Sequence, residues 1–138
     1  MTTKQWLSRA KRIDEEIDSL IQTRDETLSR IMSITQSYTA MPVQSTKDPH
    51  KFDRLAGLEF DIDRKVDELI EVKREILSTI HQISDRRYRL VLMKRYIDYK
   101  TFEKIAVEMH YSYKQVCRLH GRALIEMEGK LHESINSL

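Results

Sequence analysis

The sequence predicts an all-α protein in which a long antiparallel helical hairpin, similar to a coiled coil, precedes a C-terminal helix-turn-helix. Three observations support this. Apolar residues recur at helical spacing, the 138 residues include only 3 Gly and 2 Pro, and 33% of residues are charged against 40% hydrophobic. This composition suits long helices with solvated faces better than a thick globular core. We expect two domains, the hairpin at residues 1–83 and the helix-turn-helix at residues 84–138.

A first helix is predicted from about Thr2 to Gln36, with Thr2 and Gln5 at the spacing of a capping box. Its apolar positions advance in alternating steps of three and four residues, which describes a narrow seam. Two polar residues, Arg24 and Thr27, interrupt this seam. The apolar positions are Trp6, Ala10, Ile13, Ile17, Leu20, Ile31, Ile34 and Tyr38.

A second helix is predicted after a loop at residues 37–47. Asp48 and Pro49 form its start signal, because Asp can cap exposed amides and Pro suits the first turn. The helix extends to about Gln82, with an apolar residue at every seventh position: Leu55, Ile62, Leu69, Ile76 and Ile83.

The seam of this second helix is interrupted by Glu59 and Lys73. An apolar stripe of this length must bury against the first helix, against a second chain, or against both. We therefore expect an antiparallel hairpin within the chain and a homodimer.

Beyond residue 83 the helical segments become shorter, and each follows a residue suited to capping. Ser84 can cap a helix over about residues 85–97, and Thr101 a helix over about residues 102–109. Ser112 and Gln115 again have capping-box spacing, and they open a helix that extends to about Leu131. The last two helices, joined by a tight turn, have the form of a helix-turn-helix.

Positive charge is concentrated in one block of the chain. Residues 84–122 hold 10 Lys and Arg against 4 Asp and Glu, whereas residues 1–83 hold 13 against 15. Such a block is typical of a surface that binds a polyanion. A solvated basic face without a partner is the alternative explanation.

The second helix of the motif is expected to enter the major groove of double-stranded DNA with its first turns. Lys and Arg side chains can bind phosphate or guanine, Gln can pair with adenine, and Tyr can contact phosphate or a thymine methyl group. The predicted DNA-binding residues are Ser112, Tyr113, Lys114, Gln115, Arg118 and Arg122, with Arg87 and Lys100 as phosphate contacts from the preceding segment. Other basic residues predicted to contact phosphate are Arg86, Arg89, Lys94 and Arg95.

Residues 88–124 resemble region 4 of bacterial sigma factors. The stretch contains Val91-Leu-x-x-Arg-Tyr, then Ile105-Ala followed by a hydrophobic residue at Met109, and then Ser112-x-x-x-Val-x-x-x-His-x-x-Ala-Leu. With a helical hairpin before it, the chain is similar to RinA/ArpU-type regulators of phages of Gram-positive bacteria. The motif commonly has glycine in its turn, where this chain has His110, so His110 is expected to adopt a left-handed conformation.

This resemblance implies a phage or prophage regulator that binds near a promoter and activates late genes, with RNA polymerase as a second partner. A small terminase subunit that recognises packaging-site DNA is an alternative, as is a non-DNA interaction protein that docks on polymerase. The chain has no equivalent of sigma region 2, so we do not expect a complete sigma factor.

Other classes of function find little support in the sequence. Cys117 and His120 are three residues apart, but further metal ligands at zinc-site spacing are missing, so we expect no metal and no cofactor. No phosphate loop or nucleophile motif indicates an enzyme. The single cysteine, together with the lack of a signal peptide or an apolar span, predicts an intracellular protein with no membrane contact. The resemblance to phage regulators implies that its compartment is the cytoplasm of a bacterial host.

Overall fold

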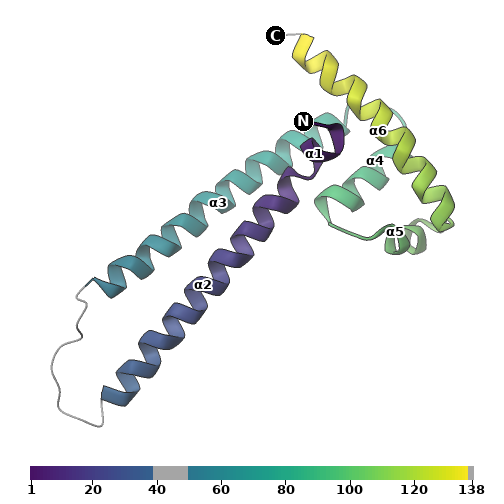
Figure 1. The fold of residues 1–138 in the computed structure, drawn as a ribbon. Helices are drawn as coiled ribbons and strands as arrows, with labels where there is room; N and C mark the ends of the chain where they lie inside the picture. Colours follow the sequence, from purple (N-terminus) through teal and green to yellow (C-terminus); the bar gives the residue numbers. More distant parts are fainter. Residues whose placement is uncertain (39–49, 137–138) are drawn as a thin grey trace. The chain divides into compact units, whose positions relative to one another are not determined.

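The computed structural model describes residues 1–38 and 50–136, and every element within them is helical (Figure 1), which confirms the all-α class. Of the predicted loop, residues 37 and 38 belong to a helix. The rest of the loop and the start signal at Asp48 and Pro49 lie outside the described residues. The elements are α1 (Thr3–Leu7), α2 (Arg9–Tyr38), α3 (Lys51–Ile80), α4 (Arg86–Leu92), the π-helical turn η1 (Met93–Ile97), α5 (Phe102–Met109) and α6 (Tyr113–Asn136).

The chain divides into two compact units. One comprises Ile13–Glu68, and the other comprises Met1–Arg12 together with Leu69–Leu138. The sequence-based division falls at residue 83, whereas this grouping joins the end of α3 and the N-terminal residues to the C-terminal helices. The reason is a shared core, which the second unit builds from both ends of the chain.

The unit Ile13–Glu68 contains the two arms of the hairpin. Lys65 Nζ lies 2.7 Å from a carboxylate oxygen of Glu16, and the Arg24 guanidinium lies 3.4 Å from Glu59. Arg24 follows Glu16 along α2, whereas Glu59 precedes Lys65 along α3. The two arms therefore run antiparallel. Polar residues that interrupt the two apolar seams thus meet each other at Arg24 and Glu59. Among the described side chains of this unit, the buried ones are Ile13, Ile17, Ile31 and Ile62.

The N-terminal helix is interrupted, and the prediction of one continuous helix from Thr2 was wrong. The predicted capping box at Thr2 and Gln5 is present, but α1 ends at Leu7 and α2 begins at Arg9. Carbonyl oxygens at the break accept hydrogen bonds from arginines, with Arg9 Nε 2.9 Å from the Trp6 oxygen and an Arg12 nitrogen 2.9 Å from the Gln5 oxygen. Side-chain donors thus replace the helical ladder, and α1 turns to pack against α6.

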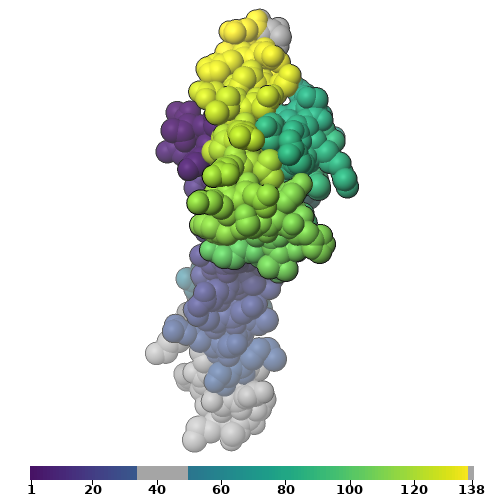
Figure 2. Space-filling view, turned by 90° about the vertical axis from the view of Figure 1, so that its right-hand side faces the viewer, coloured from purple at the N-terminus to yellow at the C-terminus, as the bar shows by residue number. Residues whose placement is uncertain are grey.

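The larger core of the second unit combines distant parts of the sequence. It joins the N-terminal residues to the end of α3, to α4 with η1, and to α6. In the view of Figure 2, α6 (yellow-green) lies between the N-terminal residues (purple) and the part of the chain coloured teal. Its buried residues are Leu7, Ala10, Ile76, Ile80, Ile83, Leu92, Tyr96, Ala123 and Met127.

The helix after residue 83 is capped by Asp85, so the prediction of Ser84 as the cap was wrong. Asp85 has an extended backbone, and its side chain accepts a hydrogen bond from the Arg87 N–H at 2.9 Å. The Ser84 carbonyl instead accepts from the Arg89 guanidinium at 2.8 Å. The helical segment reaches Ile97 as expected, but its last turn, η1, is π-helical.

A second, smaller core holds the helix-turn-helix together. Val91 of α4 packs there with residues of α5 and α6. Ala106 is 7% exposed within this core. The buried members are Val91, Ile105, Ala106, Val116 and Leu119, with Tyr88, Phe102, Met109 and Tyr111 packed around them.

Candidate nucleic-acid interface

Local hydrogen bonds define the turn between α5 and α6. Thr101 caps α5 as predicted, with its hydroxyl accepting the Lys104 N–H at 3.2 Å. His110 ends α5 in the left-handed conformation, with φ 59° and ψ 38°, as expected for a residue in the place of a turn glycine. The Tyr111 N–H then donates to the Ala106 carbonyl at 3.0 Å, so the chain reverses without unsatisfied amides at this point.

The predicted capping box at the start of α6 is present. The Ser112 N–H donates to Gln115 Oε1 at 2.8 Å, and the Gln115 N–H donates to the Ser112 hydroxyl at 3.1 Å. The side-chain oxygen of Gln115, Oε1, is therefore engaged in the cap. Only the side-chain NH₂ group of Gln115 is left for another partner. A bidentate contact of Gln115 with adenine, which needs both groups, would have to break this cap.

The outer face of α6 is basic. Lys114, Arg118 and Arg122 are exposed and follow one another at intervals of four residues, which places them on one face of the helix. Tyr113 is also exposed, but a hydrogen bond with the Cys117 thiol raises the pKa of its hydroxyl. Tyr113 therefore lies with Cys117, beside the basic face.

A hollow of about 190 Å³ lies where this basic face meets α4. Three guanidinium groups line it, those of Arg87, Arg118 and Arg122, together with Gln115, Tyr111 and Leu119. The tertiary fold thus brings Arg87 of α4 beside three of the predicted residues of α6. Tyr111 also lines the hollow and was not among the predicted DNA-binding residues; its position directly before the α6 cap was the available signal.

Arg87 is held in place by the residue that caps its own helix. Its guanidinium lies 3.0 Å from the Asp85 carboxylate, and this hydrogen-bonded pair lowers the pKa of Asp85 and raises that of Arg87. With two further arginines at the hollow, the lining keeps an excess of positive charge. This arrangement can accept a phosphate oxygen, because guanidinium groups bind phosphate with fixed geometry.

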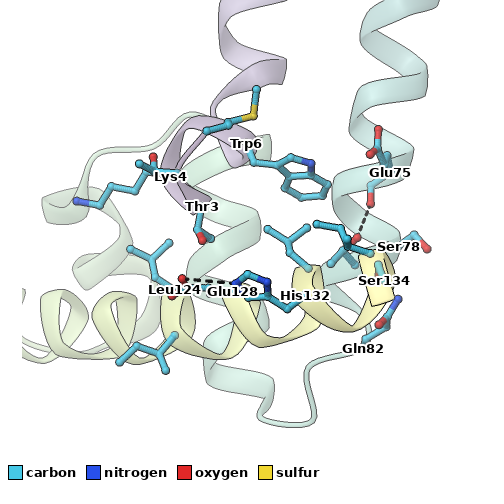
Figure 3. A pocket seen from close by; sticks show the side chains of 16 residues that line it. Thr3, Lys4, Trp6, Glu75, Ser78, Gln82, Leu124, Glu128, His132 and Ser134 are labelled. Atoms are coloured by element: carbon cyan, nitrogen blue, oxygen red, sulfur yellow. Dashed lines mark hydrogen bonds and ion pairs between the residues drawn. The ribbon is translucent and has the colours of Figure 1, made fainter. Parts of the chain in front are cut away.

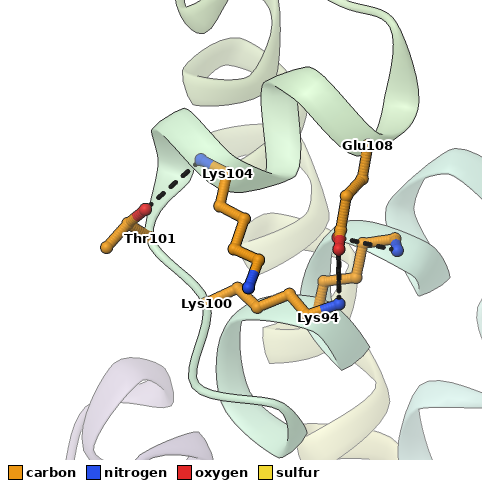
Figure 4. Close-up of polar contacts among 5 residues, drawn as sticks. All are labelled: Lys94, Lys100, Thr101, Lys104 and Glu108. Carbon is orange, nitrogen blue, oxygen red and sulfur yellow. Dashed lines mark hydrogen bonds and ion pairs between the residues drawn. The ribbon is translucent and has the colours of Figure 1, made fainter.

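Lys100, the eighth predicted DNA-binding residue, lies elsewhere. Its ammonium is 2.7 Å from one Glu108 oxygen and 3.0 Å from the other, and Lys94 contacts the same carboxylate at 3.1 Å (Figure 4). These contacts lower the pKa of Glu108, so the carboxylate stays ionised and offsets part of the two lysines' charge.

Two more basic residues that the sequence suggested as phosphate contacts are engaged with backbone carbonyls. The Arg89 guanidinium donates to the Ile83 oxygen at 2.7 Å, and Arg95 donates to the Lys100 oxygen at 3.0 Å. Arg86 remains exposed. The exposed Lys104 of α5 was not among the predicted residues, although it belongs to the same basic block. The positive block of the sequence thus serves structural as well as surface roles.

An open groove of about 1060 Å³ lies between α1, the end of α3 and the second half of α6 (Figure 3). Trp6, Leu124 and Leu131 give it apolar walls. Ile125 and Ile135 also line it and are 72% and 67% exposed. Glu128 and His132 also line the groove, with Glu128 Oε1 3.9 Å from His132 Nε2.

The described residues also bear on metal binding and on membrane insertion. No group of three or more His, Cys, Asp or Glu side chains among them is arranged to hold a metal ion. None of the described helices combines the length and apolarity that crossing a bilayer requires.

Comparison with known families gives one match. Residues 44–128, more than half of the chain, match a family model described as "Protein of unknown function (DUF1492)". The matched range includes α3, α4, α5 and most of α6, and therefore the whole helix-turn-helix. No curated protein and no solved structure matches the chain.

Proposed function

The chain belongs to the DUF1492 family, and we propose that it is a sequence-specific regulator of transcription that binds double-stranded DNA near a promoter. One observation carries the proposal. Arg87, Arg118 and Arg122 converge on a hollow at the exposed face of α6, directly after a capped helix and a left-handed turn. This is the arrangement by which a recognition helix is presented to the major groove.

The residues at this face divide by the contacts they can make. Lys114 and Arg118 lie in the first turns of α6, where a helix-turn-helix reads base edges, and an arginine side chain can bind the O6 and N7 atoms of guanine. For Arg87, which comes from a different helix and lines the same hollow, we propose a contact with a backbone phosphate. Ser112 and Gln115 set the start of the helix through their reciprocal cap.

We further propose that the target is a late promoter of a phage or prophage, in the cytoplasm of a bacterial host, with RNA polymerase as a second partner. The support is the resemblance of residues 88–124 to sigma region 4 and of the whole chain to RinA/ArpU-type regulators. The role as an activator rests on this resemblance.

We propose that the regulator is a homodimer. The helix α6 contributes Leu124 and Leu131 to the apolar walls of the large groove, and it also carries the exposed side chains of Ile125 and Ile135. Two copies related by a twofold axis would therefore each offer the other a ridge and a groove. A dimer would also suit a DNA site with two half-sites.

Selection of duplexes from a random pool tests the central proposal. At moderate salt the protein should enrich one sequence, and Arg118→Ala should weaken binding to it by about 1–3 kcal/mol while leaving random duplexes less affected. Arg74→Ala, an exposed arginine of α3, is the matched control and should bind like the wild type. Failure to enrich any sequence, with wild-type and variant proteins binding all duplexes alike, would refute sequence-specific recognition.

A further inference from the structure

A second basic hollow lies on another side of the same unit. It has a volume of about 240 Å³, and its lining comes from α1, the start of α2, η1, the beginning of α5, and α6. Three cationic side chains, those of Lys4, Lys11 and Arg95, surround it, and Tyr96 and His120 belong to its lining. Residues from the two ends of the chain thus form one concave site.

No described residue forms an ion pair with the cationic side chains at this hollow. Neither Lys4 nor Lys11 forms an ion pair with any described residue, and no described carboxylate lines the hollow. Arg95 donates to the Lys100 carbonyl at 3.0 Å and lies 4.4 Å over the Phe102 ring, contacts that orient the guanidinium without cancelling its charge. Three uncompensated cations around one cavity favour an anionic ligand.

The buried part of the lining carries a hydrogen-bonded pair. Tyr96 Oη and His120 Nε2 are 2.7 Å apart, and His120 is only 8% exposed. When the Tyr96 hydroxyl donates to Nε2, the neutral ring carries its proton on Nδ1, which makes no hydrogen bond to the described residues. Burial, together with the charges of Lys4 and Arg95, lowers the pKa of His120 to about 4. The field of two lining cations thus reaches the histidine ring.

The position of His120 on α6 separates this hollow from the proposed DNA interface. Residues two apart on an α-helix differ by about 200° around the axis. His120 is two residues from both Arg118 and Arg122, so it faces almost the opposite direction. A duplex bound on the arginine face would not bring its phosphates to this hollow.

We propose that the hollow bounded by Lys4, Lys11, Arg95 and His120 binds the phosphate group of a small molecule. The three cations supply the charge, and His120, hydrogen-bonded to Tyr96, is a polar group of the buried lining. Occupation would hold the N-terminal segment against η1 and α6, since Lys4 and Lys11 belong to the N-terminal segment, Arg95 to η1 and His120 to α6. The site is independent of the proposed DNA binding.

Inorganic phosphate is the probe for the test, added at constant ionic strength against chloride. We expect saturable shifts of the His120 ring protons in NMR spectra, an upward displacement of the His120 titration as the bound anion favours its protonated form, and a higher Tm. The double variant Lys4→Gln/Lys11→Gln should lose all three responses. The control Lys104→Gln, which removes an exposed lysine of α5, should retain them.

Two results would overturn the proposal. One is a His120 titration that is the same in phosphate and in chloride. The other is an equal response in the double variant and in the Lys104→Gln control, which would indicate a general ionic effect. A short random duplex distinguishes the source of the phosphate. If the duplex displaces inorganic phosphate from a protein that carries Arg118→Ala and Arg122→Ala, the site binds DNA and not a small molecule.

Discussion

Lys100 Nζ lies 2.7 Å from a carboxylate oxygen of Glu108, which also contacts Lys94 at 3.1 Å. One acidic residue of α5 therefore restrains two lysines of the basic block. The surface available for DNA is smaller than the charge of residues 84–122 indicates, and removal of this carboxylate should enlarge it.

Glu108→Gln should accordingly bind DNA of any sequence more tightly than the wild type. If both released lysines reach phosphates, the slope of log K against log salt should steepen by up to about 2. Salt titrations of binding to a random duplex measure this. Glu103→Gln, on the same helix and without a described ion pair, is the control. Equal changes in the two variants would point to overall charge instead of the release of Lys94 and Lys100.

His110→Gly should stabilise the protein. His110 has a φ of 59°, and a side chain in the left-handed region costs about 1–2 kcal/mol, whereas glycine adopts this conformation readily. The larger entropy of glycine in the unfolded chain offsets part of the gain, so we expect a net increase of about 0.5–1 kcal/mol in the free energy of unfolding. Denaturation in urea measures it. His110→Val should have the opposite effect, and a gain in that variant would contradict the argument.

Stability should fall as the pH decreases from about 6.5 towards 4, because of His120. Its folded pKa of about 4 lies below the unfolded value of 6.5, so in this window the unfolded chain binds a proton that the folded chain does not. The loss amounts to about 3 kcal/mol at most.

The variant His120→Gln isolates this contribution. Asp85 and Glu108, whose pKa values are lowered, also lose stabilising charge at acidic pH and do so in both proteins. The difference in unfolding free energy between wild type and variant should therefore narrow or change sign as the pH falls from 6.5 to 4. A difference that is constant with pH would exclude a role for His120 titration.

Ile125→Glu should convert the proposed dimer into a monomer. The substitution places a charge on the ridge of α6 beside the apolar groove, where a partner would have to desolvate it. Sedimentation at micromolar concentration measures the mass of each species. Val107→Glu, at an exposed apolar residue of α5, is the control and should leave the mass unchanged. A monomeric wild type would remove the basis of the prediction.

Features that depend on neighbouring residues could be predicted from the sequence. The caps at Thr2, Thr101 and Ser112 are present because each needs only a side chain and an amide three residues away. The exposed basic face of α6 follows from helical periodicity in the same way. The error at Ser84 concerned one of two adjacent capping residues, and the backbone of Asp85 decided between them.

Pairings across the chain were harder to predict. Arg24 and Glu59 were both recognised as polar interruptions of their seams, yet their contact depends on the register between two helices. The break at Ser8 carries no Gly or Pro signal, and it occurs where Leu7 and Ala10 enter a core shared with α6. The basic block likewise does not reveal that Glu108 restrains two of its lysines.

The sequence by itself determined that this protein is helical, where most of its helices begin and end, and that positive charge gathers at residues 84–122. Lys100 shows what was left to the tertiary structure: it belongs to the charged block but lies against Glu108, while Arg87 reaches the hollow beside Arg118. Periodicity and capping act within a few residues of the chain, so they can be read in sequence. Charge pairing and cavity lining depend on distances in space, which only the packed fold sets.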